Sequence, residues 1–270
     1  MKTRIPLIAA VFLGAAIASA SLLVHEPFDY TVDANIGGVA ATGTGLTGNW
    51  QRTFTDTATA ILRTYEATWD TPANYLVTPL NKGVGTPVDQ NNSAAVNLAT
   101  GAQIDFDTDG AVYYSYLLKY GTDNRSRVSF GSSSAPDLMR VQGIANGTLR
   151  VYAGGDFSDG AALATDTDYL IVGRITTSEL GSDEHRIWVY PSSGTVAGSD
   201  PGTAGSYAFH TGTITGNASM LQFSNVIDAQ YGEFRMGTTW ESVAIPEPSS
   251  ILLLGSALGL FVLFNRRRIK

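Results

Sequence analysis

The stretch AVYYSYLLK, residues 111–119, decides the fold class of this chain. Successive side chains of an extended strand point to opposite faces, so every second residue shares a face. One face of this stretch carries Val112, Tyr114, Tyr116 and Leu118. Large apolar side chains at this period predict a strand with one face in a hydrophobic core.

Two other segments are strongly hydrophobic: YLIVGRIT (169–176) and HRIWVY (185–190). Shorter strand-like runs, separated by Gly, Pro and Asn, occupy 127–131, 138–144, 148–153, 219–224, 231–237 and 239–244. We find no amphipathic helical pattern of ten residues or more and no internal repeat. Many short strands divided by turns predict an all-β fold, with antiparallel sheets packed as a two-sheet sandwich.

The first twenty residues predict a secretion signal. Lys2 and Arg4 precede an apolar run over 5–17, and the small-x-small pattern that signal peptidase requires follows. The residues of this cleavage site are Ala18, Ala20 and Ser21. We expect cleavage after Ala20; the alternative is an uncleaved membrane anchor, for which the apolar run is short.

The C-terminal residues predict a membrane helix. The run 251–264 is apolar and would make about 21 Å of helix, against a hydrocarbon core of about 30 Å. A helix that includes Ser249 and Ser250 and spans about 249–265 is longer and comes closer to the thickness of the hydrocarbon core. The basic residues that follow are Arg266, Arg267, Arg268 and Lys270, and they predict a cytoplasmic end. The alternative is a buried core helix, which a terminal arginine triplet disfavours.

Pro246, Glu247 and Pro248, followed by the apolar run and the terminal arginines, resemble the PEP-CTERM sorting signal of Gram-negative bacteria. The resemblance covers about 25 residues and includes all three parts of that signal in order. It implies that the tail holds the protein at the inner membrane. It also implies that a sorting enzyme of the exosortase type recognises Pro246, Glu247 and Pro248 and removes the tail.

We therefore expect three parts: a signal peptide (1–20), a β-sandwich domain (21–245, called the body below) and a sorting signal (246–270). Removing Lys2 and Arg4, and the four basic residues and one acidic residue of the tail, changes the net charge from −7 to −12. Nucleic acid is excluded as a partner, because binding it requires clustered positive charge. The body lacks cysteine and must be stabilised by its core.

Six segments of the body resemble an exported group with the concanavalin A-like lectin/glucanase fold, a jelly roll related to laminin-G sandwiches. The segments are EPFDY (26–30), LTGNW (46–50), VYYSYL (112–117), YLIV (169–172), IWVYP (187–191) and EFRMGTTW (233–240). The resemblance implies a two-sheet antiparallel jelly-roll sandwich. Gly232-Glu233 departs from the Asp-Glu usual in the group.

Asp105, Asp107 and Asp109, followed by Gly110, form the best candidate metal site. Alternating carboxylates before a glycine can place oxygens around Ca²⁺, but position twelve of an EF-hand loop would be Tyr116 instead of an acid. The plainer interpretation is a strand end and turn. Asp156, Asp159 and Gly160 form a second acidic loop of the same kind. We predict no other cofactor.

The sequence does not predict an enzyme. Glucanases of this fold class carry two closely spaced acids on one strand, and the body's glutamates do not follow that pattern: Glu26, Glu66, Glu179, Glu184, Glu233 and Glu241. Its histidines, His25, His185 and His210, lack zinc-ligand spacing. His185 is expected to be a surface strand residue, and Asp183-Glu184 a solvated turn.

The remaining binding candidates are aromatic rings and threonines. Trp69, beside Asp70 and Pro72 in an expected loop, is the candidate for contact with a sugar ring. Trp50 and Trp240 are expected in the core, and the face occupied by Trp188 is left open. Alternating threonines, which could form an ice-binding array, are Thr53, Thr55, Thr57, Thr59, Thr211, Thr213 and Thr215; ordinary exposed strands are the plainer interpretation.

The leading hypothesis is an exported, non-catalytic protein, anchored in the inner membrane and then sorted to the cell surface or extracellular matrix. Its partners would be signal peptidase, an exosortase-type enzyme and extracellular polysaccharide, with a glycan-binding or purely structural role. One alternative is a glycan-degrading hydrolase or lyase of the same fold. A weaker alternative is binding to ice or another surface through the threonines.

Overall fold

The computed structural model describes residues 21–51, 62–75, 79–85, 92–120, 126–135, 137–144, 146–225 and 229–245. The predicted signal peptide and sorting signal, including Pro246, Glu247, Pro248 and the terminal arginines, lie outside the described residues. Among the residues that are described, no helix has the length and apolar character needed to cross a membrane.

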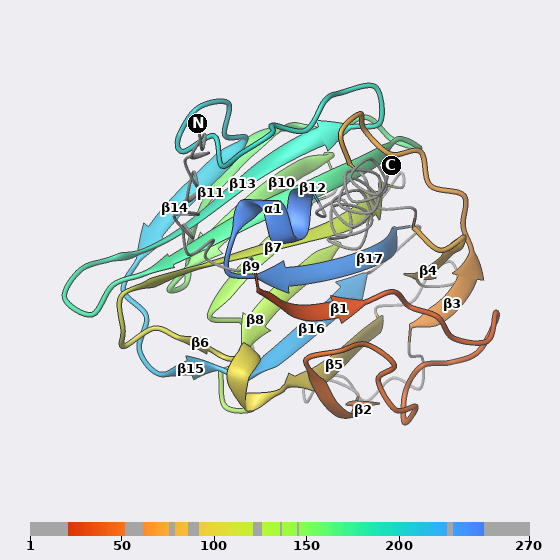
Figure 1. Ribbon diagram of the computed structural model, residues 1–270, viewed down its shortest axis with the longest axis horizontal. Coiled ribbons are helices and arrows are strands. Elements are labelled where there is room, and N and C mark those ends of the chain that lie inside the picture. Colours follow the sequence, from red (N-terminus) through yellow and green to blue (C-terminus); the bar gives the residue numbers. More distant parts are fainter. Residues whose placement is uncertain are drawn as a thin grey trace, which may run out of the picture.

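The described body is an antiparallel sandwich of two large sheets (Figure 1). The eight-stranded sheet has the order β14 (Ala208–Gly212), β13 (Asp183–Pro191), β12 (Asp168–Thr177), β7 (Gly110–Lys119), β17 (Gln230–Gly237), β4 (Lys82–Gly85) and β3 (Arg63–Glu66), and β1 (Leu22–Glu26) also pairs with β17. The all-β sandwich predicted from the strand pattern is confirmed.

The seven-stranded sheet has the order β11 (Asp156–Ala162), β10 (Thr148–Ala153), β9 (Met139–Gly143), β8 (Arg127–Gly131), β16 (Met220–Asn225), β5 (Asn92–Leu98) and β2 (Leu46–Gln51). Three small elements complete the described structure: the 3₁₀ turn η1 (Thr100–Ala102), and the paired strands β6 (Ile104–Asp105) and β15 (Asn217–Ala218). The predicted strands 127–131 and 148–153 match β8 and β10 residue for residue.

One predicted strand is wrong. Residues 239–244 form the short helix α1 (Trp240–Ala244), not a closing strand. Thr239 is the N-cap, and its side-chain hydroxyl accepts a hydrogen bond from the backbone N–H of Ser242 at 3.3 Å. This bond satisfies one of the amides that a helix start leaves unpaired.

The main core lies between the two sheets. On β7, Tyr114, Tyr116 and Leu118 point into it, as the alternation predicts. Gly173 on the neighbouring strand β12 provides the space for the Tyr114 ring, because a Cβ there would lie about 2.0 Å from that ring. Trp50 is also fully buried in this core and donates from Nε1 to the hydroxyl of Tyr30 at 2.7 Å.

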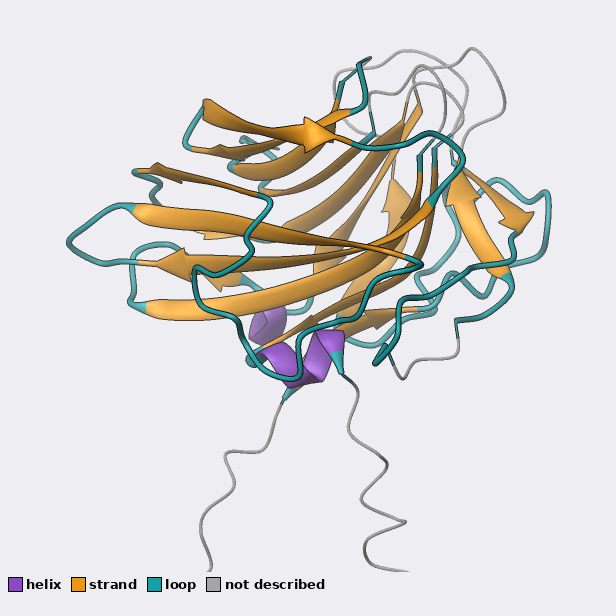
Figure 2. Cartoon of the chain, turned by 90° about the horizontal axis from the view of Figure 1, so that it is seen from above, coloured by secondary structure: helices purple, strands orange, loops and turns teal. Residues whose placement is uncertain are grey.

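A second apolar cluster covers the outer side of the eight-stranded sheet. Leu117, Trp188 and Trp240 meet there, with the two tryptophan rings edge to face at 5.2 Å. Figure 2 shows α1 against the outside of this layer. The segment 192–206 also packs on it, since Trp188 and Trp240 both donate to its carbonyl groups. Trp188 therefore lies on the outer face of the eight-stranded sheet, where this cluster and the segment 192–206 bury it.

The two ends of the described body are bonded to each other. The backbone N–H of Thr238 donates to the Ser21 carbonyl at 3.0 Å, and the Ser21 N–H donates to the Thr238 hydroxyl at 3.3 Å. α1 begins two residues after Thr238. The described chain therefore begins and ends on the same side of the molecule, the side of α1 (Figure 2).

Candidate functional site

Trp69 lies in the loop after β3, as predicted, but it is not open to a sugar. Only 7% of the residue is exposed. Its ring packs against the backbone at Gly83 and Gly232, where any added Cβ would approach the ring to within 3 Å. Nε1 donates to the Lys82 carbonyl at 3.0 Å. The proposed glycan contact at Trp69 is therefore corrected: the ring supports the join between β4 and β17.

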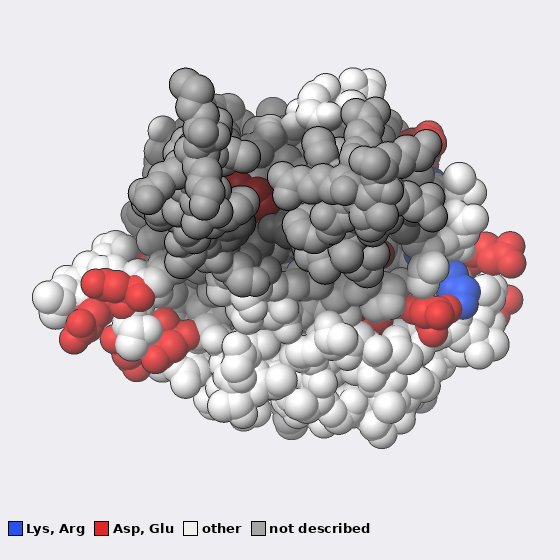
Figure 3. Space-filling view, viewed as in Figure 1, with Lys and Arg blue, Asp and Glu red and all other residues white. Residues whose placement is uncertain are grey.

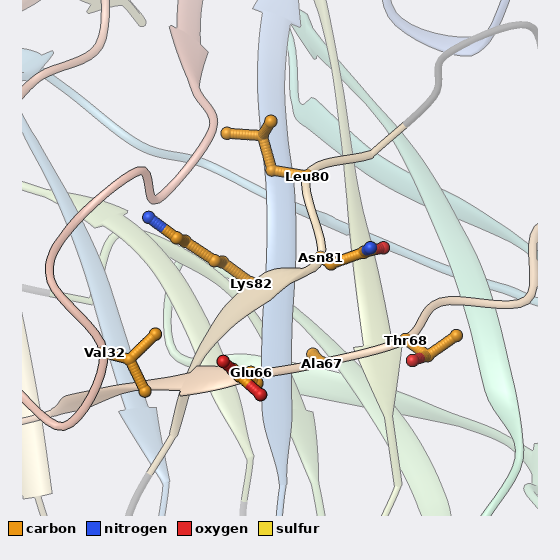
Figure 4. A pocket seen from close by; sticks show the side chains of 7 residues that line it. All are labelled: Val32, Glu66, Ala67, Thr68, Leu80, Asn81 and Lys82. Carbon is orange, nitrogen blue, oxygen red and sulfur yellow. The ribbon is translucent and has the colours of Figure 1, made fainter.

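A groove of about 630 Å³ lies next to Trp69 (Figure 4). Its lining residues are Val32, Glu66, Ala67, Thr68, Leu80, Asn81 and Lys82. The Lys82 ammonium is already engaged, with Asp29 at 2.6 Å and the Tyr30 carbonyl at 2.9 Å. Glu66 is the single carboxylate among these lining residues, so they offer no acid pair and no aromatic ring.

The candidate calcium ligands are held by backbone amides. Asp105 accepts from the N–H of Asp107, Asp107 from Gly216, and Asp109 from Glu179, at 3.0 to 3.1 Å. These bonds match the turn interpretation. Figure 3 shows acidic side chains gathered at the end of the molecule where β12 turns into β13. No group of three or more metal-ligating side chains forms within the described part of the chain, so calcium gains no support from geometry.

The second acidic segment is not a loop. Asp156, Asp159 and Gly160 belong to β11, the edge strand of the seven-stranded sheet. Asp159 pairs with Arg150 on β10, with 2.7 Å between Oδ1 and Nε. Edge strands often carry charged residues, which discourage pairing with other chains, and this explains why the segment looked like a loop.

His185 and Asp183 are also buried, contrary to prediction. Asp183 opens β13 and accepts from the backbone of Ser178 and of Ile214. The His185 ring is hydrogen-bonded at both nitrogens, to the Tyr114 hydroxyl at 2.6 Å and to the Tyr152 carbonyl at 3.0 Å. Burial lowers the pKa of His185 to about 4. A neutral histidine donating from Nδ1 fits this site.

Glu26 and Glu233 are further buried carboxylates, and both have partners. Glu26 accepts from the backbone N–H of Phe28 and from the Tyr30 hydroxyl, and burial raises the pKa of Glu26. Glu233, at a bulge of β17 with φ +44°, lies 2.7 Å from His25 and 3.2 Å from Arg235. Both groups join strands and do not face a groove described here.

The exposed aromatic rings indicate a binding surface. Of all aromatic side chains in the described residues, the two that are exposed are Phe157 (43%) and Phe209 (47%). They lie on β11 and β14, the neighbouring edge strands of the two sheets. These strands border a cavity of about 430 Å³, called the edge groove below, lined by Ser158, Asp159, Ser206, Tyr207, Ala208, Phe209, His210 and Thr211.

Each exposed phenylalanine has an arginine stacked over its ring. The Arg150 guanidinium lies 4.3 Å from the Phe157 centroid, and that of Arg186 lies 4.2 Å from the Phe209 centroid. Asp159 holds Arg150, and Glu184 holds Arg186 through two hydrogen bonds of 2.9 and 2.7 Å. Both rings are thus fixed in place while nearly half of each residue stays exposed.

Polar groups line the groove. Phe209 is among its lining residues and Phe157 is not, because Phe157 and Ser158 are successive residues of β11 and point to opposite faces. His210 Nδ1 and the Ser158 hydroxyl are hydrogen-bonded at 3.0 Å and link the edges of the two sheets. Tyr207 lies against Gly160, where a Cβ would be 1.8 Å from the Tyr207 ring, so the close approach requires glycine. Aromatic faces beside hydroxyl, imidazole and carboxylate groups form a surface suited to sugars.

The threonine array receives no support as a flat surface. Thr53, Thr55, Thr57 and Thr59 lie outside the described residues. Thr211, Thr213 and Thr215 are exposed, but only Thr211 belongs to a strand, β14. The hydroxyls of the three therefore do not share one strand face.

No protein-family model matches the chain, and no curated protein matches it. Solved structures do. An endo-β-1,4-glucuronan lyase from the fungus Trichoderma reesei has 12% identity and a TM-score of 0.38 over 78% of this chain and 97% of its own. The PL-14 alginate lyase from Aplysia kurodai has 8% identity and a TM-score of 0.37 over 70% and 87%.

A structure of botulinum neurotoxin type C, whose cell entry depends upon interaction with two ganglioside molecules, has 7% identity and a TM-score of 0.42. That match covers 79% of this chain and 48% of the toxin chain. All three likenesses are too distant to support an argument about this protein, so its function must be argued from its own residues.

Proposed function

We propose that this protein is an exported, non-catalytic surface or matrix protein that binds glycans in the edge groove. One observation carries the proposal: the exposed aromatic residues of the described body, Phe157 and Phe209, both belong to the strands that border this groove. Aromatic rings combined with a few polar groups are a common feature of binding surfaces.

The geometry suits a saccharide ligand. The free face of an aromatic ring can pack on the apolar C–H face of a sugar ring, while hydroxyl groups bond to neighbouring polar side chains. His210, Ser158 and Ser206 supply donors and acceptors on the same groove as Phe209. The groove lies where the edge strands of the two sheets, β11 and β14, are neighbours.

The remainder of the proposal rests on the sequence. The concanavalin A-like jelly roll is proposed as the finer fold of the sandwich. Signal peptidase would cut before Ser21, and the tail would hold the protein at the inner membrane until an exosortase-type enzyme acts at Pro246, Glu247 and Pro248. Extracellular polysaccharide would then be the ligand.

The test is binding of the purified protein to a panel of bacterial and algal polysaccharides, with release of reducing ends monitored. We expect binding without release. Phe157→Ala and Phe209→Ala should each weaken binding about fivefold, since a ring–ring packing contact contributes about 1 kcal/mol. Leu180→Ala is the matched control, because Leu180 is 94% exposed at the turn between β12 and β13.

Two results would contradict the proposal. If both phenylalanine variants bind as tightly as the control, the edge groove is not the site. If reducing ends appear, the protein is a glycan-degrading enzyme.

A further inference from the structure

The outer face of the seven-stranded sheet carries three arginines on consecutive strands. Arg127 lies on β8, Arg140 on β9 and Arg150 on β10, and all three are partly exposed. This grouping stands out on a body whose net charge is −12. Arg150 is paired with Asp159, whereas Arg127 and Arg140 share a single carboxylate, that of Asp137.

Because the two arginines share one carboxylate, other hydrogen-bonding atoms of these three side chains are left without a partner in the described part of the chain. Both arginines reach the same oxygen, Oδ2 of Asp137, through Nη1 at 3.0 Å. Nε belongs to the side of a guanidinium that grips a carboxylate with two parallel bonds. Neither Nε has a hydrogen-bond partner within the described residues, and Asp137 Oδ1 has none either.

Other arginines of the protein use Nε. Arg150 donates from Nε to Asp159, Arg186 from Nε to Glu184, and Arg235 from Nε to Glu233. Arg127 and Arg140 differ from these three although they lie close to an acid, and Arg174 is a further arginine whose Nε has no partner within the described residues. A buried donor without a partner costs about 1 to 3 kcal/mol, so a ligand that supplies an acceptor would recover this energy.

A buried hydroxyl lies in the same place. Ser129 is fully buried, and its Oγ has no partner within the described residues. It pairs across the strands with Arg140, which in turn pairs with Tyr152. The Arg140 guanidinium stacks on the Tyr152 ring at 3.7 Å, which fixes the plane of the fork. The Ser129 hydroxyl, the oriented Arg140 guanidinium and the Tyr152 ring therefore belong to paired residues of three neighbouring strands.

We propose that Arg127, Arg140 and Ser129 form a second binding site, for the carboxylate of a uronic acid residue in an acidic polysaccharide. The carboxylate would take the Nε side of Arg140 or Arg127 as these partly exposed side chains shift, and the same shift would uncover the buried Ser129 hydroxyl for a ring hydroxyl. Two arginines against one aspartate leave one positive charge to attract the anion. The inference rests on the proposed function in that the ligand is a glycan, but the residues are separate from the edge groove.

A guanidinium fork binds a planar carboxylate with two parallel N–H bonds and can also hold two oxygens of a sulfate ester, so both anions are compared in the experiment. Two coplanar oxygens match the two parallel N–H bonds of a guanidinium fork, whereas lysine binds anions as a point charge. Replacing arginine by lysine therefore keeps the charge and removes the fork.

The experiment is calorimetric titration of the purified protein with oligogalacturonate, a neutral β-glucan oligosaccharide and dextran sulfate. Arg140→Lys and Arg127→Lys should each weaken oligogalacturonate binding about tenfold or more and leave β-glucan binding unchanged. Arg63→Lys, an exposed arginine on β3, is the matched control. Circular dichroism confirms that each variant is folded, and Ser129→Ala tests the same site without a change of charge.

Each outcome of the titration supports or overturns the inference. Oligogalacturonate bound no better than β-glucan, or lysine variants equal to the control, would overturn the inference and leave the edge groove standing. Dextran sulfate bound more tightly than oligogalacturonate, and retained by the lysine variants, would show a point-charge site instead. Absence of binding to any glycan would overturn the proposed function as well.

Discussion

The buried histidine illustrates the residue scale. His185 is fully buried in β13 with both ring nitrogens bonded, and burial lowers the pKa of its imidazole to about 4. From sequence, His185 was expected at the surface of its strand, although it shares a strand face with Ile187 and Val189. The structure differs because Tyr114, on β7 beyond β12, brings its hydroxyl to the ring, a contact between residues 71 positions apart.

This histidine predicts a pH dependence of stability. Between pH 6.5 and about 4 the unfolded chain binds a proton at this residue that the folded chain does not bind. Acid therefore favours unfolding, and His185 should contribute a loss of about 2 to 3 kcal/mol in the free energy of unfolding between pH 7 and pH 4.5. Urea unfolding of the protein and of His185→Gln at both pH values measures it.

The variant should lose less stability on acidification than the parent protein, although it is less stable at pH 7. His210→Gln serves as the control, because His210 is only partly buried at the edge groove. Equal acid sensitivity in the parent and in His185→Gln would show that another group is responsible.

At the scale of elements, sequence patterns work where a strand has one face in the core. All but one residue of β8 and all but one of β10 are buried, and both strands were predicted with the correct ends. β11 was missed because DFSDGAA lies at the sheet edge and has no buried face, so no apolar face marks it as a strand. α1 was mistaken for a strand because the apolar residues Trp240, Val243 and Ala244 cover the sheet from outside.

The N-cap of α1 can be tested directly. Thr239→Ala removes the side-chain acceptor of the Ser242 N–H and should lower the free energy of unfolding by about 1 kcal/mol. Thr239→Ser keeps the hydroxyl and should lose much less. Urea midpoints of the two variants decide it: equal losses would mean that the methyl group of Thr239, and not the cap, matters.

The candidate sites could not be predicted from the sequence, because the arrangement of the strands brings together residues that are distant in the chain. Phe157 and Phe209 are 52 residues apart and lie on neighbouring strands only because the edges of two different sheets are neighbours. Arg127 and Arg140 converge only through the register of β8 with β9. Trp69, the ring that the sequence favoured, is buried by glycines from β4 and β17, which no local pattern reveals.

At the scale of the whole molecule, the two outer faces of the sandwich differ in what covers them. The outer side of the eight-stranded sheet is closed by α1 and the segment 192–206, which the network of Arg174, Asp200 and Tyr113 holds down. The outer side of the seven-stranded sheet carries the arginines instead. The edge groove lies where the two sheets meet.

The bond between Ser21 and Thr238 sets the orientation of the body on any support. The chain enters and leaves beside α1, so a body tethered at residue 245 turns the closed sheet toward its attachment point. The arginine-bearing sheet then faces outward, and the edge groove lies at the flank. Under the proposed function, the attachment point and the arginine-bearing binding surface therefore lie on opposite sides of the sandwich.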